Sequence, residues 1–383
     1  MTSRTSAGGR RGRLRLMSAL ARRVSPIVIC ALAWQCGGDP LAPPPLAEDP
    51  IALEVTSMRA LLAANAAKTD PLWVQVRPGV TAALDLAQQA LAAGRRWTAL
   101  ERLAAARTNL VAARYVSERP AEARRDVPGF EAEWARMGAE LGAATDAPTA
   151  KAFDRVYPAA ARALAEASAF QVRVMYDAGI EYGRATDADS GLYYVGSAQA
   201  QQQFAAFART VLRSATPAVP VRSLAAETDA LETTLLALYR PPVSIDRHPE
   251  FIGASSALKE ARELDEAGLR YGALQRYLLA VLRTALLRPA PPLSEAEALR
   301  ARLLAVAPRL SDFSSDHTIA AMFLERALTE LDRPEPTAAS VGIAQAVADE
   351  VLPKYFAALE AGPSPVAPRT PRVTVTLVRW PFT

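Results

Sequence analysis

Hydrophobic residues recur every three or four positions along most of the chain after residue 50, and polar residues fill the positions between them. This spacing places the apolar side chains on one face of an α-helix, whereas a half-buried strand alternates at every second residue. The pattern therefore predicts an all-α protein. A proline-containing break at 216–221 separates two groups of helical segments. The predicted helices are 51–68, 77–93, 96–116, 127–144, 148–186 and 190–213 before the break, and 223–240, 251–267, 270–288, 294–308, 313–332 and 336–360 after it.

The two groups of predicted helices resemble each other in sequence. The matched segments, in chain order, are 83–106 with 257–280, 131–136 with 295–300, and 195–200 with 341–346, at offsets of 174, 164 and 146 residues. The order is kept and the offset shrinks steadily, as expected if a second copy lost length. Chance similarity between alanine-rich helices is the alternative. We predict a duplicated six-helix unit, at 51–216 and 222–362, that forms an irregular αα-solenoid or a paired bundle.

The last segment of the chain has a different pattern. Residues 372–379 are mostly β-branched and have an alternating pattern, which predicts one short C-terminal β-strand within a tail at 363–383. A lone strand cannot satisfy its own backbone donors and acceptors. It either lies along the helical body, stays mobile, or adds to the edge of a partner's sheet.

The first 36 residues have the layout of an export signal. Arg22 and Arg23 precede an apolar run from Val24 to Trp34, which is too short to span a bilayer. Cys36 and a proline-rich stretch at 37–50 follow. This layout resembles a bacterial lipoprotein signal, and the resemblance implies acylation of Cys36, a flexible tether and a membrane-anchored protein of the bacterial cell envelope.

Two alternatives to lipidation stay open for this segment. Cleavage after Ala33 would release a soluble exported, periplasmic protein, and an uncleaved structural helix would keep the segment in the fold. A start at Met17 would give the signal a more ordinary basic beginning, and we predict that Met17 is the true start.

Net charge changes its sign once the predicted signal is set aside. The chain has 44 Lys and Arg against 40 Asp and Glu, and seven of those arginines precede Cys36, where there is no acid. Subtracting the seven leaves 37 bases against 40 acids in residues 37–383, a net charge of −3. Nucleic-acid binding requires a basic surface on the folded domain, so we expect no nucleic acid among the partners.

Small residues in the second group of helices resemble a tetratricopeptide helical hairpin. Ala261, Gly268, Ala273, Tyr277 and Ala280 have that family's spacing. The corresponding residues of the first group are Ala87, Gly94, Ala99, Leu103 and Ala106. The resemblance covers only these two hairpins, without an array of about 34-residue repeats. It implies antiparallel packing of neighbouring helices.

Sequence motifs for nucleotide binding, acyl transfer and metalloprotease chemistry do not occur, so we expect no cofactor. His248 and His317 are far apart and lack a cluster of further ligands, so we expect no metal site. The stretch from Asp187 to Gly191 resembles a calcium loop superficially, but Leu192 and Ala198 stand where such a loop needs Gly and Glu. We interpret it as a turn that caps a helix.

Four tyrosines flank that turn and form the candidate ligand pocket. They are Tyr176, Tyr182, Tyr193 and Tyr194. Tyrosine combines an apolar ring with one polar group, which suits a binding pocket, although core packing at the helix ends is the simpler explanation of the cluster.

These observations favour a non-catalytic, membrane-tethered binding or scaffold protein of the bacterial cell envelope. Its helical surface would hold a protein partner or a small ligand. The alternative is an exported solute-binding protein or enzyme with its site in the cleft between the two helical halves.

Overall fold

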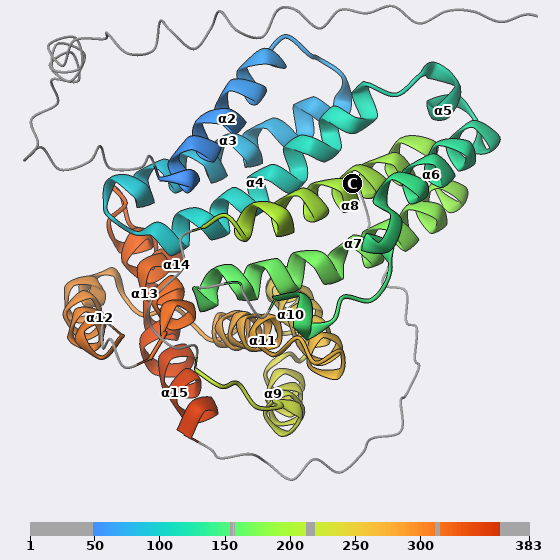
Figure 1. The fold of residues 1–383 in the computed structure, drawn as a ribbon. Helices are drawn as coiled ribbons and strands as arrows, with labels where there is room; N and C mark the ends of the chain where they lie inside the picture. The colour runs from blue at the N-terminus through green and yellow to red at the C-terminus, as the bar shows by residue number, and fades with distance from the viewer. Residues whose placement is uncertain (1–48, 154–155, 157, 212–218, 311–314, 361–383) are drawn as a thin grey trace, which may run out of the picture. The chain divides into compact units, whose positions relative to one another are not determined.

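The computed structural model describes residues 49–153, 156, 158–211, 219–310 and 315–360. Over these residues the protein is all-α, as the hydrophobic pattern predicts, and no strand occurs in them (Figure 1). The predicted signal segment with Met17 and Cys36, most of the tether and the strand at 372–379 lie outside the described residues.

The N-terminal half runs from α2 to α8. Its helices are α2 (Pro50–Ala64), α3 (Pro71–Ala92), α4 (Arg96–Ser117), α5 (Ala121–Arg125), α6 (Val127–Leu141), α7 (Ala159–Ala185) and α8 (Ala188–Ala208). Aspartates start four of them. Asp49, Asp70, Asp126 and Asp187 each accept a hydrogen bond from a backbone N–H of the first turn, which satisfies a donor that has no partner within the helix.

The C-terminal half runs from α9 to α15. Its helices are α9 (Ala225–Leu238), α10 (His248–Glu266), α11 (Arg270–Ala285), α12 (Ala296–Leu310), α13 (Thr318–Leu331), α14 (Ala338–Ala346) and α15 (Leu352–Glu360). A π-helical turn, Val347–Val351, joins α14 to α15, so the helix predicted at 336–360 is one helical run with a local widening.

The helix predicted at 148–186 is wrong at its beginning. A separate 3₁₀ turn covers Ala150–Phe153, and α7 begins only at Ala159 with Pro158 as its N-cap. Proline lacks a backbone N–H and disfavours a helical conformation for the residue before it. The helix therefore begins only after Pro158, although the hydrophobic pattern continues across this residue.

Helices α3 and α4 form one helical hairpin, and α10 and α11 form another. The turn within each hairpin has the same geometry. Gly94 has φ 71° and Gly268 has φ 76°. In both turns the backbone N–H that follows the glycine donates to the carbonyl five residues before it, from Arg95 to Ala90 (2.7 Å) and from Leu269 to Leu264 (2.8 Å). The two turns lie 174 residues apart, which is the offset found in the sequence.

Buried positions in the two hairpins follow the same offset. The pairs Leu84 and Leu258, Ala87 and Ala261, Ala99 and Ala273, Leu103 and Tyr277, and Ala106 and Ala280 are all buried. Small residues at most of these places let the helix axes approach closely, and the predicted antiparallel packing is confirmed for both hairpins.

The halves meet mainly through α4 and α7 of the N-terminal half and α11 and α13 of the C-terminal half. In the N-terminal half α4, α8 and α7 lie side by side, and α10 and α11 cross beneath α7 (Figure 1). Helix α11 packs on α7, α13 packs on α4, and α7 also touches α13. One cluster of buried apolar residues extends from Ile51 to Ala358 through both halves, and a smaller one around Phe130 lies beneath α5 and α6.

Candidate functional site

Three of the four candidate tyrosines come together at the turn between α7 and α8. The rings of Tyr182 and Tyr194 stack with their centroids 4.6 Å apart, and Tyr193 meets Tyr194 edge-on at 6.4 Å. The Tyr193 hydroxyl donates a hydrogen bond to Asn109 Oδ1 at 2.6 Å. Burial raises the pKa of Tyr193 to about 12, so this hydroxyl remains a donor at neutral pH.

The fourth candidate, Tyr176, lies against α6 instead. Its ring stacks on Trp134 at 4.5 Å, its hydroxyl donates to the Trp134 carbonyl, and Trp134 Nε1 donates to the Tyr176 carbonyl. None of the four tyrosines lines either of the two cavities described below. The interpretation of the neighbouring turn is confirmed, because Asp187 caps α8 by accepting from the Ser190 N–H.

Both histidines lie beside tyrosines. His248 Nδ1 is 2.7 Å from the Tyr239 hydroxyl, and His317 Nδ1 is 3.0 Å from the Tyr355 hydroxyl. Within the described ranges, no group of three or more His, Cys, Asp or Glu side chains is arranged to hold a metal ion.

A cavity of about 490 Å³ opens between α2, α4, α6 and α8. This volume lies in the range of small-molecule sites. Its apolar lining consists of Met58, Leu61, Val111 and Met137. Its charged lining consists of Arg107, Arg114, Arg119, Arg136, Glu118 and Glu140. We call it the arginine cavity.

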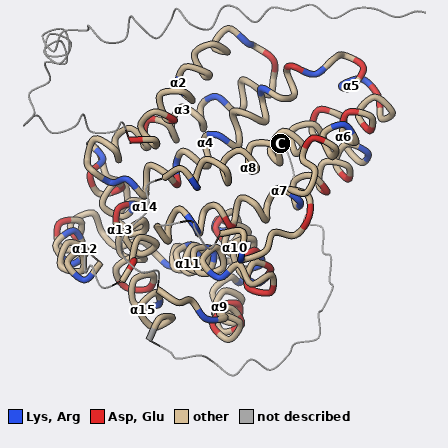
Figure 2. The backbone as a smooth tube through the Cα atoms, in the orientation of Figure 1, with Lys and Arg blue, Asp and Glu red and all other residues tan. Residues whose placement is uncertain are grey.

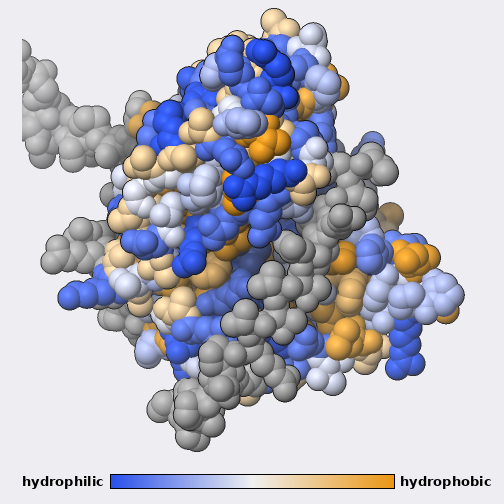
Figure 3. Space-filling view, turned by 90° about the vertical axis from the view of Figure 1, so that its right-hand side faces the viewer, coloured by the Kyte–Doolittle hydropathy of each residue, from blue (hydrophilic) through white to orange (hydrophobic). Residues whose placement is uncertain are grey.

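Acidic and basic residues both occur on α6 and the adjoining α5 (Figure 2), and hydrophilic side chains cover the upper part of the face that these helices share (Figure 3).

A buried carboxylate organises one wall of this cavity. Glu133 of α6 accepts hydrogen bonds from Tyr115 Oη (2.6 Å), Arg119 Nη1 (2.7 Å), and Arg136 Nε and Nη2 (2.7 and 2.6 Å). Burial alone would raise the pKa of Glu133, but these donors outweigh burial and lower the pKa to about 2. The carboxylate therefore remains ionised and fixes both guanidinium groups and the tyrosine.

Glu133 is not among the candidate residues from the sequence, although its position on α6 contained a signal. Phe130, Glu133, Met137 and Leu141 are spaced by three or four residues and form the buried face of α6. A glutamate on that face requires buried cationic or hydrogen-bonding partners. Glu131, two residues earlier, points away and pairs with Arg184 at 2.6 Å.

Arg107 links the helices of the opposite wall. From α4 it contacts Glu54 of α2, and its Nη2 lies 3.2 Å from Gln203 Oε1 of α8. Burial lowers the pKa of this guanidinium, while the charge of Glu54 raises it. The contacts join three helices at the edge of the cavity.

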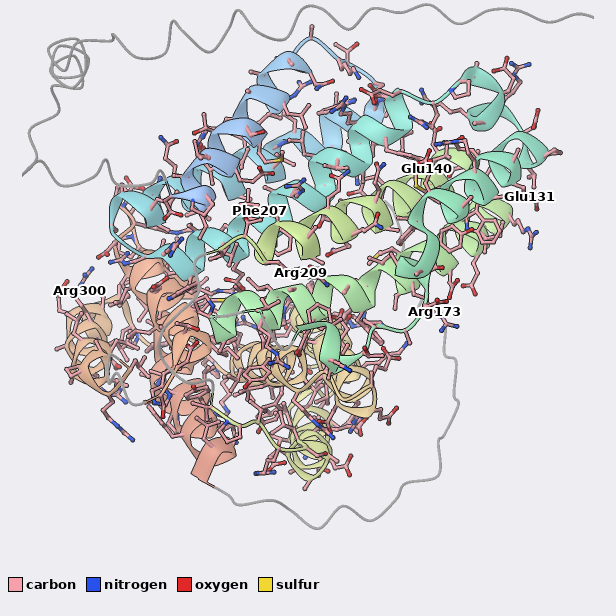
Figure 4. All side chains as sticks on the ribbon, in the orientation of Figure 1. Glu131, Glu140, Arg173, Phe207, Arg209 and Arg300 are labelled. Atoms are coloured by element: carbon pink, nitrogen blue, oxygen red, sulfur yellow. The ribbon has the colours of Figure 1, made fainter. Side chains whose placement is uncertain are left out.

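At the same cavity, Arg114 and Arg136 are more exposed than Arg107 and Arg119. Arg114 Nε donates to Glu118 at 2.7 Å, and these side chains are 47% and 44% exposed. Arg136 also contacts Glu140, with side chains 42% and 50% exposed. Glu140 lies nearer the middle of the molecule than Glu131, which stands at its outer edge (Figure 4).

A second cavity of about 310 Å³ lies between α9, α11 and the helical run from Val347 to Glu360. Six of its lining residues correspond to lining residues of the arginine cavity. Val281, Ala285 and Arg288 follow Arg107, Val111 and Arg114 at the offset of 174, and Ala230, Leu231 and Thr234 follow Ser57, Met58 and Leu61 at an offset of 173. The charged residues of this lining are Glu227, Arg288, Glu350 and Lys354.

Compared with known proteins, the chain matches no family model, no curated protein and no solved structure. Across the part of the chain that the structure describes, no helix is both long enough and apolar enough to cross a membrane.

Proposed function

We propose that the protein is a non-catalytic, membrane-tethered binding protein of the bacterial cell envelope, and that it holds a small ligand in the arginine cavity. The observation that carries the proposal is the cavity itself. It has a ligand-sized volume, an apolar portion that includes the buried Met58 and Met137, and convergent polar groups that Glu133 holds in place. Fixed polar groups lower the entropic cost of binding.

We also propose that the helical body arose by duplication of a six-helix unit and forms a paired bundle. The equal turns at Gly94 and Gly268 and the matched buried positions support this arrangement. The contacts between the halves support it as well, because α4 packs on α13 while the corresponding α11 packs on α7. Such a reciprocal exchange is the pattern of an isologous dimer interface.

This duplication favours a site within each half over one between the halves. Both cavities are lined by the first, third and last helices of their half, and α6 adds a further wall to the arginine cavity. At the contact of α7 with α11, residues such as Ala163, Ala167 and Leu274 are buried. The alternative, an enzyme or solute-binding protein with its site in the cleft between the halves, has no comparable observation in its favour.

The ligand site is tested by filling the cavity. Ser57 lines it from an exposed position on α2, so Ser57→Trp should occupy the cavity without disturbing the core. Thr56→Trp, at the neighbouring exposed position, is the matched control. In a thermal-shift screen of small organic acids, amines and neutral solutes, compounds that raise the Tm of the wild type should also raise that of Thr56→Trp, but not that of Ser57→Trp. Shifts that persist in Ser57→Trp, or no shift at all, would contradict the proposal.

The tether is tested separately. Expressed in a bacterium that processes lipoproteins, the chain should appear in the membrane fraction with a lipid adduct on Cys36, and Cys36→Ser should release it. A soluble product cleaved after Ala33 would remove the tether and leave the ligand site standing. Peptides from residues 1–16 in the precursor would contradict a start at Met17.

A further inference from the structure

We infer that the ligand of the arginine cavity is an amphiphilic carboxylate, a small molecule with an apolar body and an anionic head group. The inference rests on the proposed function and specifies its ligand class. The first argument is charge. Four guanidinium groups but only two carboxylates line the cavity. Glu54 and Glu133 offset the charges of the other two guanidinium groups, but they are not among the lining residues.

The guanidinium groups differ in how firmly they are held. Arg107 and Arg119 contact Glu54 and Glu133, and all four of these side chains are at most 21% exposed. Arg114 and Arg136 contact Glu118 and Glu140, whose carboxylates are about half exposed. Exposed ion pairs contribute little free energy, so an incoming carboxylate can replace these two partners at low cost.

Geometry at Arg136 also favours a carboxylate. Glu133 holds its Nε and Nη2, which fixes the plane of the guanidinium before a ligand arrives, and the contact with the exposed Glu140 is through Nη1. A carboxylate ligand would take the place of Glu140 as acceptor. Charge-assisted hydrogen bonds of this kind are stronger than neutral ones and are stronger again where water is partly excluded.

The second cavity serves as an internal comparison. Its lining carries two basic and two acidic residues, and Val281 stands where the arginine cavity has Arg107. Among the lining residues, only the arginine cavity has more basic than acidic side chains, and we assign anion binding to that cavity alone.

The test uses three ligands with the same apolar body. Octanoate, octanol and octylammonium are titrated calorimetrically into the full chain at low salt. We expect octanoate to bind most tightly and octylammonium most weakly, and octanoate binding to weaken as salt rises. Ser57→Trp should abolish octanoate binding.

Variants of the rim pair sharpen the test. Arg114→Gln should weaken octanoate binding about tenfold and change octanol binding less than twofold. Glu118→Gln removes the competing carboxylate and should strengthen octanoate binding about threefold. The corresponding changes at an exposed i,i+4 pair on α7, Arg173→Gln and Asp177→Asn, should change neither. Arg114 and Glu118 are both exposed, so these variants are expected to fold.

The outcomes separate the two proposals. If octanol or octylammonium binds as well as octanoate and Ser57→Trp abolishes binding, the cavity is a ligand site but the inference of an anionic ligand fails. If octanoate binds but Arg114→Gln and Glu118→Gln have no effect, the inference also fails. No octanoate binding at low-millimolar concentration overturns the inference, and the screen with Ser57→Trp then decides the proposed function by itself.

Discussion

Glu166 and Glu325 perform the same task from opposite sides of the contact between the two halves. Each lies seven residues after the first residue of its helix, α7 or α13. Glu166 accepts a hydrogen bond from the Gly272 N–H (2.8 Å) at the start of α11, and Glu325 accepts from the Trp97 and Thr98 N–H groups (2.7 and 2.9 Å) at the start of α4.

This reciprocity explains how two helices can begin at a buried contact. The first N–H groups of a helix have no partner inside it, and Arg95 and Leu269 provide no side-chain cap for α4 and α11. A carboxylate from the other half supplies the acceptor and also interacts favourably with the positive end of the helix dipole.

Glu325 should make stability depend on pH. Burial raises its pKa to about 7, although the Thr98 and Trp97 N–H groups and the charges of Arg95 and Arg96 lower it. The folded state then binds a proton more tightly than the unfolded state, whose glutamate has a pKa of 4.5. This contribution is fully present below about pH 4.5 and is lost as pH rises to about 7, a decrease of at most about 3 kcal/mol.

Glu325→Gln keeps an acceptor oxygen but cannot ionise, so this part of the pH dependence should disappear. Urea unfolding at pH 5 and pH 8 measures it, with the exposed Glu131→Gln as control. An unchanged difference between the two pH values in Glu325→Gln would show that Glu325 does not titrate in this range.

Glu166 should be more costly to remove. Its side chain is fully buried, and besides the Gly272 N–H it pairs with Arg162 at 2.9 Å. Glu166→Ala takes the carboxylate away from a buried guanidinium and should lower the free energy of unfolding by about 3 to 5 kcal/mol. Glu131→Ala, which removes the exposed pair with Arg184, should cost less than about 1 kcal/mol. Similar losses in denaturant unfolding for both variants would contradict the role given to Glu166.

The hydrophobic pattern predicted most of the helices because most have a buried face of their own. It missed residues 71–76 of α3 and all of α5, and the failure at Pro158 has a local cause. The shared hairpin of the two halves was visible because small residues recur where its helices approach closely and a glycine with positive φ follows the first helix of each copy. The reciprocal glutamates were not found, since the acceptor and the helix that it caps are 106 residues apart at Glu166 and 227 and 228 residues apart at Glu325.

The arginine cavity could not be predicted for a similar reason. Its residues come from four helices, and none of its arginines belongs to a local motif. The tyrosines form a candidate group in the sequence because they flank a single turn, and the structure places three of them together and Tyr176 on Trp134. Only the position of Glu133 on the buried face of α6 indicated this wall of the cavity. The sequence does not show that Arg119 and Arg136 both bind Glu133.

The equivalence of the two hairpin turns predicts equal responses to substitution. Gly94 and Gly268 have positive φ, and a Cβ at either position would meet no neighbouring atom, so the penalty for alanine is backbone strain alone. Gly94→Ala and Gly268→Ala should each destabilise the protein by about 1 kcal/mol. Gly79→Ala, in open space inside α3, should stabilise it by about 0.5 to 1 kcal/mol. Thermal unfolding compares all three, and a large effect at only one turn would contradict their equivalence.

The wall around Glu133 predicts a response to acid with the opposite sign from that of Glu325. Its pKa, about 2, lies below the unfolded value of 4.5. Its contribution to stability is therefore present above about pH 4.5 and is lost as pH falls through about 2. Tyr115→Phe removes one hydroxyl donor to this carboxylate and should raise the pKa of Glu133.

At pH 7, Tyr115→Phe should be less stable than the wild type by about 1.5 to 3 kcal/mol, the usual contribution of a hydrogen bond to a charged group. The difference should shrink toward pH 2, where Glu133 takes up a proton in both proteins. Tyr193→Phe removes a hydroxyl that donates to the neutral Asn109, so its effect should be the same at both pH values. Denaturant unfolding at pH 7 and pH 2.5 measures all three proteins. A constant deficit for Tyr115→Phe would mean that its hydroxyl stabilises the fold without acting through the charge of Glu133.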